Sequence, residues 1–190
     1  KGRARITFFD ETLNNVWNFK SERKTSLLIT TGNFRRMKNN FTLTISPFRI
    51  NSLSPLAGVK SCNYLEKILV LKDAGEKGFD EAVCLNERDE IVSASTANIF
   101  WVKNEQIFTP SLQTGCLAGT TRELILENFT AREKQVYIDE LDRADEIFLT
   151  SSGIGITKAS RVEHNQFVAF KITENLQKFL KNSIKLGKFF

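Results

Sequence analysis

Short apolar runs alternate with polar, turn-prone residues over the first quarter of the chain. Four runs rich in β-branched and aromatic side chains are expected to form strands: residues 4–9, 15–20, 26–31 and 40–45. Residues 46–55 contain Pro47 and Pro55, which predict a loop. These strands are typical of a small α+β unit, and a domain junction is expected between residues 32 and 42.

Helical spacing of the apolar positions begins near residue 60. Large apolar side chains then recur three and four positions apart: Tyr64, Leu65, Ile68, Leu69 and Leu71. Gly75 and Gly78 follow, and glycine is typical of the end of a helix. The pattern therefore predicts a helix from about residue 60 to residue 74, with Lys60 at its entrance.

Strand-like runs return after Gly78 and alternate with further helices. Four runs separated by polar turns predict a meander of antiparallel strands: residues 81–86, 91–95, 97–102 and 107–110. The later elements are expected in this order: a helix at 121–129, a strand at 134–138, a helical turn at 139–144, a strand at 146–152, a hairpin to about residue 170 and a helix at 174–185. The sequence thus predicts an α+β (mixed β/α) fold.

Composition and charge narrow the class of protein. The 190 residues are 41% apolar and 26% charged, as in ordinary globular domains. The net charge of +5 comes from scattered Lys and Arg without a nucleic-acid-binding motif, so a solvated surface is favoured over a nucleic-acid patch. No apolar run approaches the roughly 18 residues that a membrane-spanning helix needs. Neither a nucleic acid nor a membrane is expected as a partner.

The cysteines and the single histidine do not suggest metal chemistry. Cys62, Cys84 and Cys116 have no metal-site spacing, so reduced thiols in a cytoplasmic protein are expected. His164 lies in the polar stretch VEHNQF and is expected to be solvated. With a single histidine, neither a His-rich metal site nor a Ser/His/Asp triad is easy to build, so no metal site is expected.

Two glycine-containing junctions carry residues that suit an anion. In LAGTTRELI, Gly119, Thr120 and Thr121 stand at the start of a predicted helix, where free backbone N–H groups and the helix dipole favour negative charge. The alternative is that Thr120 or Thr121 caps the helix. In TSSGIGI, residues 150–156, serines and glycines at a strand end could offer donors to the same anion, although such residues are also common in turns.

Lys60 is the third candidate, because it lies between the loop PLAGV and the apolar helix. Burial there would favour the free amine, which is nucleophilic. The alternative is a solvated lysine, although a cation at a helix N-terminus is unfavourable for the helix dipole.

Three segments, taken in order, resemble a known family. The run STANIFWVKNEQIFTPSLQTGCLAGTTRE, residues 95–123, resembles the signature region of the class IV, fold-type IV pyridoxal-phosphate enzymes. The matching positions are Asn98, Ile99, Phe100, Thr109, Pro110, Gly115, Leu117, Gly119, Thr121 and Arg122. Upstream, GVKSCNYLEKILVL resembles the segment of the family's Schiff-base lysine, which maps onto Lys60; downstream, DEIFLTSSGIGI resembles a phosphate-binding segment and maps onto Ser152. The resemblance covers roughly residues 40–165.

The resemblance implies a fold, a cofactor and a site. The family comprises the branched-chain and D-amino-acid aminotransferases and aminodeoxychorismate lyase, so a D-amino-acid-aminotransferase-like fold is expected. Residues 1–38 would be the remainder of a small N-terminal domain, and residues 39–190 the large domain that binds pyridoxal 5′-phosphate. An amino-acid-like substrate and a homodimer are also implied. The implied cofactor-binding residues are Lys60, Ser93, Asn98, Gly119, Thr120, Thr121 and Ser152, with Lys60 as the catalytic base.

Two departures from the family pattern bear on the reaction. Ser93 stands where the family has a glutamate that pairs with the pyridine nitrogen, and a hydroxyl supplies no charge there. The ring should then be a weaker electron sink, which disfavours full transamination more than elimination. The second departure is that the small domain ordinarily provides an arginine for the cofactor phosphate, and none of Arg35, Arg36 and Arg49 can be assigned that role.

These considerations give three hypotheses for function. The first is a 4-amino-4-deoxychorismate lyase that yields 4-aminobenzoate and pyruvate for folate synthesis. The second is an aminotransferase for branched-chain or D-amino acids. The third is a non-catalytic homologue that keeps the fold as a binding module.

Overall fold

The computed structural model describes residues 2–11, 24–33 and 38–185. The chain divides into two compact units, Lys1–Met37 and Lys38–Phe190. In the first unit, the strands β1 (Gly2–Asp10) and β2 (Thr25–Asn33) pair antiparallel. This confirms the strands predicted at 4–9 and 26–31, whereas the strand predicted at 15–20 lies outside the described residues.

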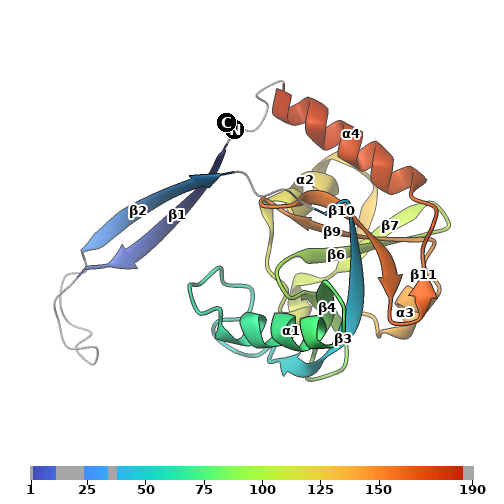
Figure 1. Ribbon diagram of the computed structural model, residues 1–190, viewed down its shortest axis with the longest axis horizontal. Helices are drawn as coiled ribbons and strands as arrows, with labels where there is room; N and C mark the ends of the chain where they lie inside the picture. Colours follow the sequence, from blue (N-terminus) through green and yellow to red (C-terminus); the bar gives the residue numbers. More distant parts are fainter. Residues whose placement is uncertain (1, 12–23, 34–37, 186–190) are drawn as a thin grey trace. The chain divides into compact units, whose positions relative to one another are not determined.

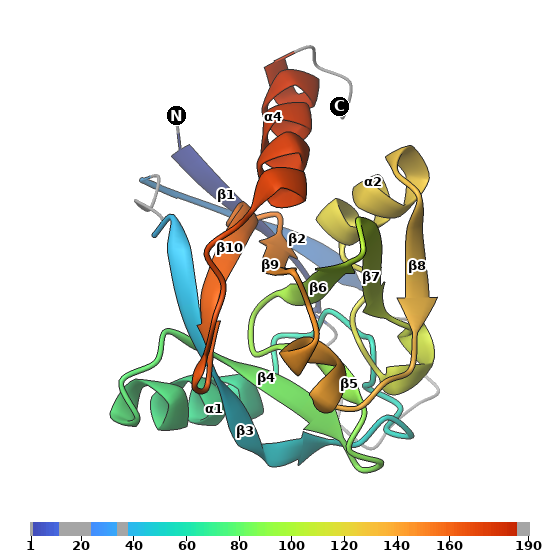
Figure 2. The same cartoon turned by 90° about the vertical axis from the view of Figure 1, so that its right-hand side faces the viewer.

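The second unit is built on a nine-stranded mixed sheet (Figures 1 and 2). Its strands are β3 (Asn40–Ile50), β4 (Glu81–Asn86), β5 (Ile91–Ala94), β6 (Asn98–Lys103), β7 (Gln106–Pro110), β8 (Ala131–Lys134), β9 (Glu146–Ser151), β10 (Gly155–Val162) and β11 (Asn165–Gln166). The order is β5-β4-β3-β10-β9-β6-β7-β8, and β11 pairs with β10. β3 runs parallel to β4 and to β10, and β7 runs parallel to β8, whereas the other pairs are antiparallel.

Four α-helices connect or flank these strands. They are α1 (Leu65–Glu76), α2 (Thr120–Asn128), α3 (Asp139–Asp142) and α4 (Lys171–Lys185), and a 3₁₀ turn spans Leu112–Thr114. In Figure 1, α1 lies against β3 and β4, whereas α2 contacts β8 and β9, and α4 contacts β9 and β10. No helix in the described ranges is long and apolar enough to cross a membrane.

The side chains of the central strands alternate between two apolar clusters. Along β9, Ile147 and Leu149 join the cluster that contains Trp101, and Phe148 points to the opposite face. On that face Phe148 stacks on Phe100, with ring centroids 5.0 Å apart. Helices α2 and α4 cover this second cluster, because Ile125 and Leu176 belong to it. A two-residue alternation of this kind is what a sheet buried on both faces requires.

Several sequence-based predictions are wrong in detail. Residues 46–50 continue strand β3 instead of forming a loop, and Pro47, which has no N–H to donate, lies where the pairing register with β4 shifts. The antiparallel meander is confirmed for the pairs β4–β5 and β6–β7 and is wrong between them, because β6 pairs with β9 and not with β5. β8 ends at Lys134, so the strand predicted at 134–138 is displaced toward the N-terminus.

Helix α1 differs from its prediction at both its start and its buried face. It begins at Leu65 and not at Lys60, which lies in the preceding loop. It continues through Gly75 and ends before Gly78, whose φ of 78° favours glycine. Its buried residues are Val70 and Ala74, whereas Leu65, Ile68 and Leu69 of the predicted apolar stripe are exposed.

Candidate functional site

Asn98, the first residue of β6, lies in direct contact with Gly119 at the entrance of α2. Its Nδ2 donates a 2.8 Å hydrogen bond to the carbonyl oxygen of Leu117. A Cβ atom built on Gly119 would lie 2.2 Å from Asn98 Oδ1, which is closer than atoms approach one another. A side chain at position 119 would therefore displace the Asn98 side chain, whose hydrogen bond to Leu117 fixes the turn before α2 to the start of the inner strand β6.

The N-terminus of α2 carries no side-chain cap. Its N-cap is Gly119, and the first helical hydrogen bond runs from Glu123 N to Gly119 O at 2.9 Å. The amides of the first turn, which include those of Thr120 and Thr121, precede that bond. Neither threonine is the capping residue, so the capping alternative is wrong. Thr121 is buried and Thr120 is exposed, and the positive end of the helix dipole favours an anion at this point.

Arg122 fixes the same turn of α2 to the sheet. Its side chain is almost fully buried, and Nη2 donates to Pro110 O at 3.0 Å and pairs with Glu133. Pro110 ends β7 and Glu133 lies on β8. The start of α2 is therefore held by the strand β6 on one side and by β7 and β8 on the other.

The end of β9 lies beside Asn98. Thr150 is the register partner of Asn98 across the β6–β9 pair, so both residues face the side of the sheet that α2 covers. Thr150 is fully buried, and among the described residues its hydroxyl has no hydrogen-bond partner. Ser151 Oγ accepts a 3.2 Å hydrogen bond from Ile154 N, and Ser152 is exposed in the turn that follows. Asn98, the start of α2 and the β9–β10 turn therefore lie together.

Lys60 lies in an exposed loop and contacts Tyr64, the N-cap residue of α1. Its Nζ donates a 2.6 Å hydrogen bond to Tyr64 Oη and lies 5.1 Å from the centre of the tyrosine ring. Gly58, two residues earlier, donates from its N–H to Gly115 O at 3.1 Å. The Lys60 loop is thus attached to the turn at Gly115, from which residues 116–119 lead into α2.

Ser93 lies on β5, apart from the contacts at Gly119. It is half-buried, and its register partner is Cys84 on β4. Burial, and secondarily the nearby Glu81, raises the pKa of the Cys84 thiol to about 12. Neither member of this pair therefore carries charge at neutral pH. A tight bend, closed by Ala94 N donating to Ala97 O at 2.9 Å, leads from β5 to Asn98.

Glu81 was missed by the sequence analysis. Its buried carboxylate accepts hydrogen bonds from Ser95 N at 2.8 Å, from Ser95 Oγ at 2.6 Å and from Thr96 Oγ1 at 3.0 Å. Burial raises the pKa of Glu81 despite these bonds. Glu81 holds the bend between Ser93 and Asn98, and a charged residue opening the apolar run EAVCLN was the available signal.

Comparison with known proteins identifies the family. Residues 2–162 match the amino-transferase class IV family. The chain is 33% identical over 132 residues to aminodeoxychorismate lyase from Vibrio harveyi, covering 64% of this chain and 48% of the relative. It is 35% identical over 123 residues to a branched-chain-amino-acid aminotransferase from Pseudomonas aeruginosa, covering 60% and 40%.

A solved structure gives the same result for the fold. The branched-chain aminotransferase of Thermoproteus uzoniensis superimposes with a TM-score of 0.87 at 25% identity, covering 99% of this chain and 66% of that one. The chain belongs to the class IV aminotransferases, whose cofactor is pyridoxal 5′-phosphate. The resemblance and the fold class predicted from the sequence are confirmed. The chain spans less than half the length of the two relatives named from V. harveyi and P. aeruginosa.

Proposed function

We propose that this chain is the cofactor-binding part of a 4-amino-4-deoxychorismate lyase, which eliminates pyruvate from its substrate to give 4-aminobenzoate. The observation that carries the choice of reaction is Ser93, which stands where the family pattern has the acid that pairs with the pyridine nitrogen. Its register partner Cys84 is also uncharged at neutral pH. Without a fixed negative charge there, the ring draws off less electron density. Elimination tolerates this better than transamination, since a leaving group departs as charge develops.

The residues at the start of α2 fit the phosphate of pyridoxal 5′-phosphate. The amides at the start of α2 have no side-chain cap and are donors of the kind that such an anion needs. The buried hydroxyl of Thr150, which has no hydrogen-bond partner among the described residues, is another donor. We assign Thr120, Thr121 and Ser152 as further hydroxyl donors. Gly119 and Asn98 would hold these donors in place.

Lys60 would attach the cofactor and move protons. Bound pyridoxal phosphate supplies an aldehyde that combines with amines and a ring that stabilises the electron pair left when the α-proton of the substrate departs. Lys60 Nζ would first hold the cofactor and would then take that α-proton. The Tyr64 hydroxyl, 2.6 Å from Nζ, would orient the amine for both tasks.

The test is product formation by the purified protein that contains this chain, loaded with pyridoxal 5′-phosphate. Incubation with 4-amino-4-deoxychorismate should release 4-aminobenzoate and pyruvate in equal amounts. With a panel of branched-chain and D-amino acids, conversion of the cofactor to its amine form should be slow or absent. Fast conversion without release of 4-aminobenzoate would replace the lyase by the aminotransferase, which is the second candidate because the aminotransferase from P. aeruginosa is as similar to the chain as the lyase from V. harveyi.

Ser93→Glu tests the reason given for the lyase. A carboxylate at this position should speed conversion of the cofactor to its amine form by about tenfold or more, because a charge-paired ring nitrogen is a better electron sink. Ser93→Gln is the matched control, with the same size and no charge, and should leave that rate near the wild-type value. Equal rates for Glu and Gln would show that Ser93 does not govern the choice of reaction.

We also propose that the protein is a homodimer. Support comes from the large apolar side chains exposed on either side of Lys60: Leu53, Leu56, Val59, Leu65, Ile68 and Leu69. Sedimentation equilibrium should give twice the mass of the polypeptide, and a monomer at micromolar concentration would contradict the proposal. A cytoplasmic location stays a prediction.

A further inference from the structure

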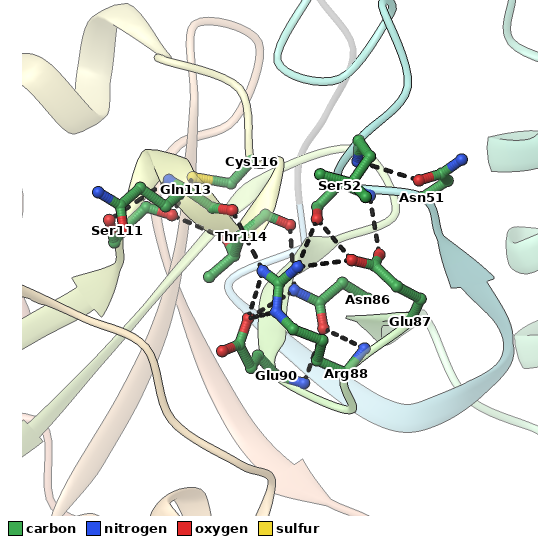
Figure 3. Close-up of polar contacts among 11 residues, drawn as sticks. Asn51, Ser52, Asn86, Glu87, Arg88, Glu90, Ser111, Gln113, Thr114 and Cys116 are labelled. Carbon is green, nitrogen blue, oxygen red and sulfur yellow. Dashed lines mark hydrogen bonds and ion pairs between the residues drawn. The ribbon is translucent and has the colours of Figure 1, made fainter.

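Three segments that flank the candidate site meet at Arg88 (Figure 3). Arg88 lies in the β4–β5 turn, and its Nη1 donates to Ser52 Oγ at 2.9 Å, in the loop that leads to Lys60. Its Nη2 reaches Gln113 O at 3.4 Å, in the 3₁₀ turn that leads to Gly115 and α2. One guanidinium group therefore contacts both of the segments that carry the two ends of the proposed cofactor site.

Two glutamates hold the guanidinium group in this position. Glu87 Oε1 accepts from Arg88 Nη1 at 2.6 Å, and Glu90 Oε2 accepts from Nη2 at 2.8 Å and from Nε at 3.0 Å. Glu87 also accepts from Ser52 N at 2.9 Å and from Ser52 Oγ at 2.7 Å. The planar fork of arginine suits this two-sided contact, and lysine cannot reproduce it.

Buried groups beneath Arg88 also join the β4–β5 turn to the 3₁₀ turn at residues 112–114. Asn86 is fully buried, and its Nδ2 donates to Glu90 Oε2 at 2.7 Å and to Thr114 O at 3.4 Å. Gly115 follows Thr114 with a φ of 93°, and a Cβ atom on Gly115 would lie 3.1 Å from Ser52 Cα. Position 115 therefore requires glycine, and the Ser52 loop packs directly on the turn that enters α2.

We propose that Arg88 is a positioning residue that sets the spacing between Lys60 and the N-terminus of α2. This inference rests on the proposed function, because it assumes that one cofactor molecule is bound at both places, by its phosphate and by its aldehyde carbon. A cofactor of fixed length can form its bond to Lys60 only if the loop stands at the matching distance from the phosphate site. When an enzyme positions two reacting groups, a misplacement of either one by about 1 Å lowers the reaction rate on the order of a hundredfold.

The test compares two cofactor forms that differ only at the aldehyde carbon. Pyridoxal 5′-phosphate binds at both ends, whereas pyridoxamine 5′-phosphate keeps the phosphate contacts and cannot bond to Lys60. Arg88→Gln should weaken binding of the aldehyde form by about tenfold and binding of the amine form by less than about twofold. Arg88→Lys keeps the charge but loses the planar fork of arginine. Its affinity for the aldehyde form should lie between those of the wild type and Arg88→Gln.

Arg143→Lys is the matched control. Arg143 is the C-cap residue of α3 and forms an exposed ion pair, with Nη2 3.1 Å from Asp139 Oδ2. Within the described residues its side chain makes no hydrogen bond or ion pair with either loop. It should bind both cofactor forms as the wild type does. If the Arg88 variants lose equal affinity for both cofactor forms, or lose affinity for neither, the positioning role is overturned. If the wild-type protein does not form a borohydride-stable bond at Lys60, the proposed function itself fails before Arg88 is tested.

Discussion

The two ends of the candidate site are built in different ways. The end at α2 is part of the core: Asn98, Gly119 and Arg122 join the helix to the strands through buried contacts. The end at Lys60 is an exposed loop, which is held by Gly58 and by the polar contacts of Ser52 with Glu87 and Arg88. The contacts of the core hold the proposed phosphate end at α2, whereas polar and charged side chains near the surface hold the loop that carries Lys60.

Gly119→Ala should have the largest effect, because its Cβ atom would overlap Asn98 Oδ1. The start of α2 or the Asn98 side chain must then move, and pyridoxal 5′-phosphate binding should weaken by about a hundredfold or more. Gly75→Ala is the control, since Gly75 lies within α1 with no atom near the position of the added Cβ. That variant should bind the cofactor normally and be more stable by about 0.5–1 kcal/mol. Equal behaviour of the two variants would contradict the contact between Asn98 and Gly119.

Glu81→Ala should strongly destabilise the fold, because Glu81 is a buried acceptor. It leaves Ser95 N, Ser95 Oγ and Thr96 Oγ1 without their acceptor, which should lower the free energy of unfolding by about 2–4 kcal/mol. Urea denaturation measures this value. A loss below about 0.5 kcal/mol would show that the bend before Asn98 does not depend on Glu81.

The pH dependence of Glu81 has a definite sign. Because burial raises the pKa of Glu81 in the folded state, the part of its contribution to stability that depends on protonation is fully present below its ordinary pKa of 4.5 and is lost as the pH rises through the raised value. Glu81→Gln removes this titration. The stability of the wild type relative to Glu81→Gln should therefore fall between acid and neutral pH, and a constant difference would contradict the raised pKa.

Asn98→Ala should have an intermediate effect. It removes the hydrogen bond to Leu117 O and should weaken cofactor binding by about tenfold, corresponding to about 1.4 kcal/mol. Asn128→Ala removes a hydrogen bond of the same type, from Nδ2 to Leu124 O at 2.9 Å, at the far end of α2. The control should retain cofactor affinity. If it loses as much affinity as Asn98→Ala, general loosening of α2 and not the contact at Gly119 explains the result.

Glu87→Gln should have the smallest effect, because this carboxylate is exposed. Hydrogen bonds from the side chain and backbone of Ser52 lower the pKa of Glu87 from 4.5 to about 2. Its contribution to stability is therefore present above pH 4.5 and is lost as the pH falls toward 2, which is the opposite sign to Glu81. Melting curves of wild type and Glu87→Gln should converge toward pH 2, and a constant separation between pH 2 and 7 would contradict this account.

The sequence predicted those parts of the site whose determinants are local. Helix α2 and the strands β4, β6, β7 and β9 follow from short-range patterns and matched within a few residues. The uncapped start of α2 after Gly119 likewise depends on one short stretch of sequence. Anion binding there stays a prediction, as do the roles assigned to Lys60, Ser93, Asn98, Thr120, Thr121 and Ser152.

Non-local contacts were beyond the sequence analysis. Pairing of β6 with β9, which brings Thr150 beside Asn98, joins residues about 50 positions apart. The buried face of α1 was also misjudged, because Val70 and Ala74 pack on Ala82 and Cys84 while the larger Leu65 and Ile68 remain exposed. Hydrophobic spacing indicates a helix but does not tell which side the sheet will cover.

Borohydride reduction of the cofactor-loaded protein, followed by peptide mapping, tests the central claim most directly. The account predicts that the reduced cofactor is found on the peptide that contains Lys60, and that Lys60→Ala abolishes the label while the protein still binds pyridoxamine 5′-phosphate. Label on a different lysine, or a loaded protein that borohydride does not label, would contradict the account.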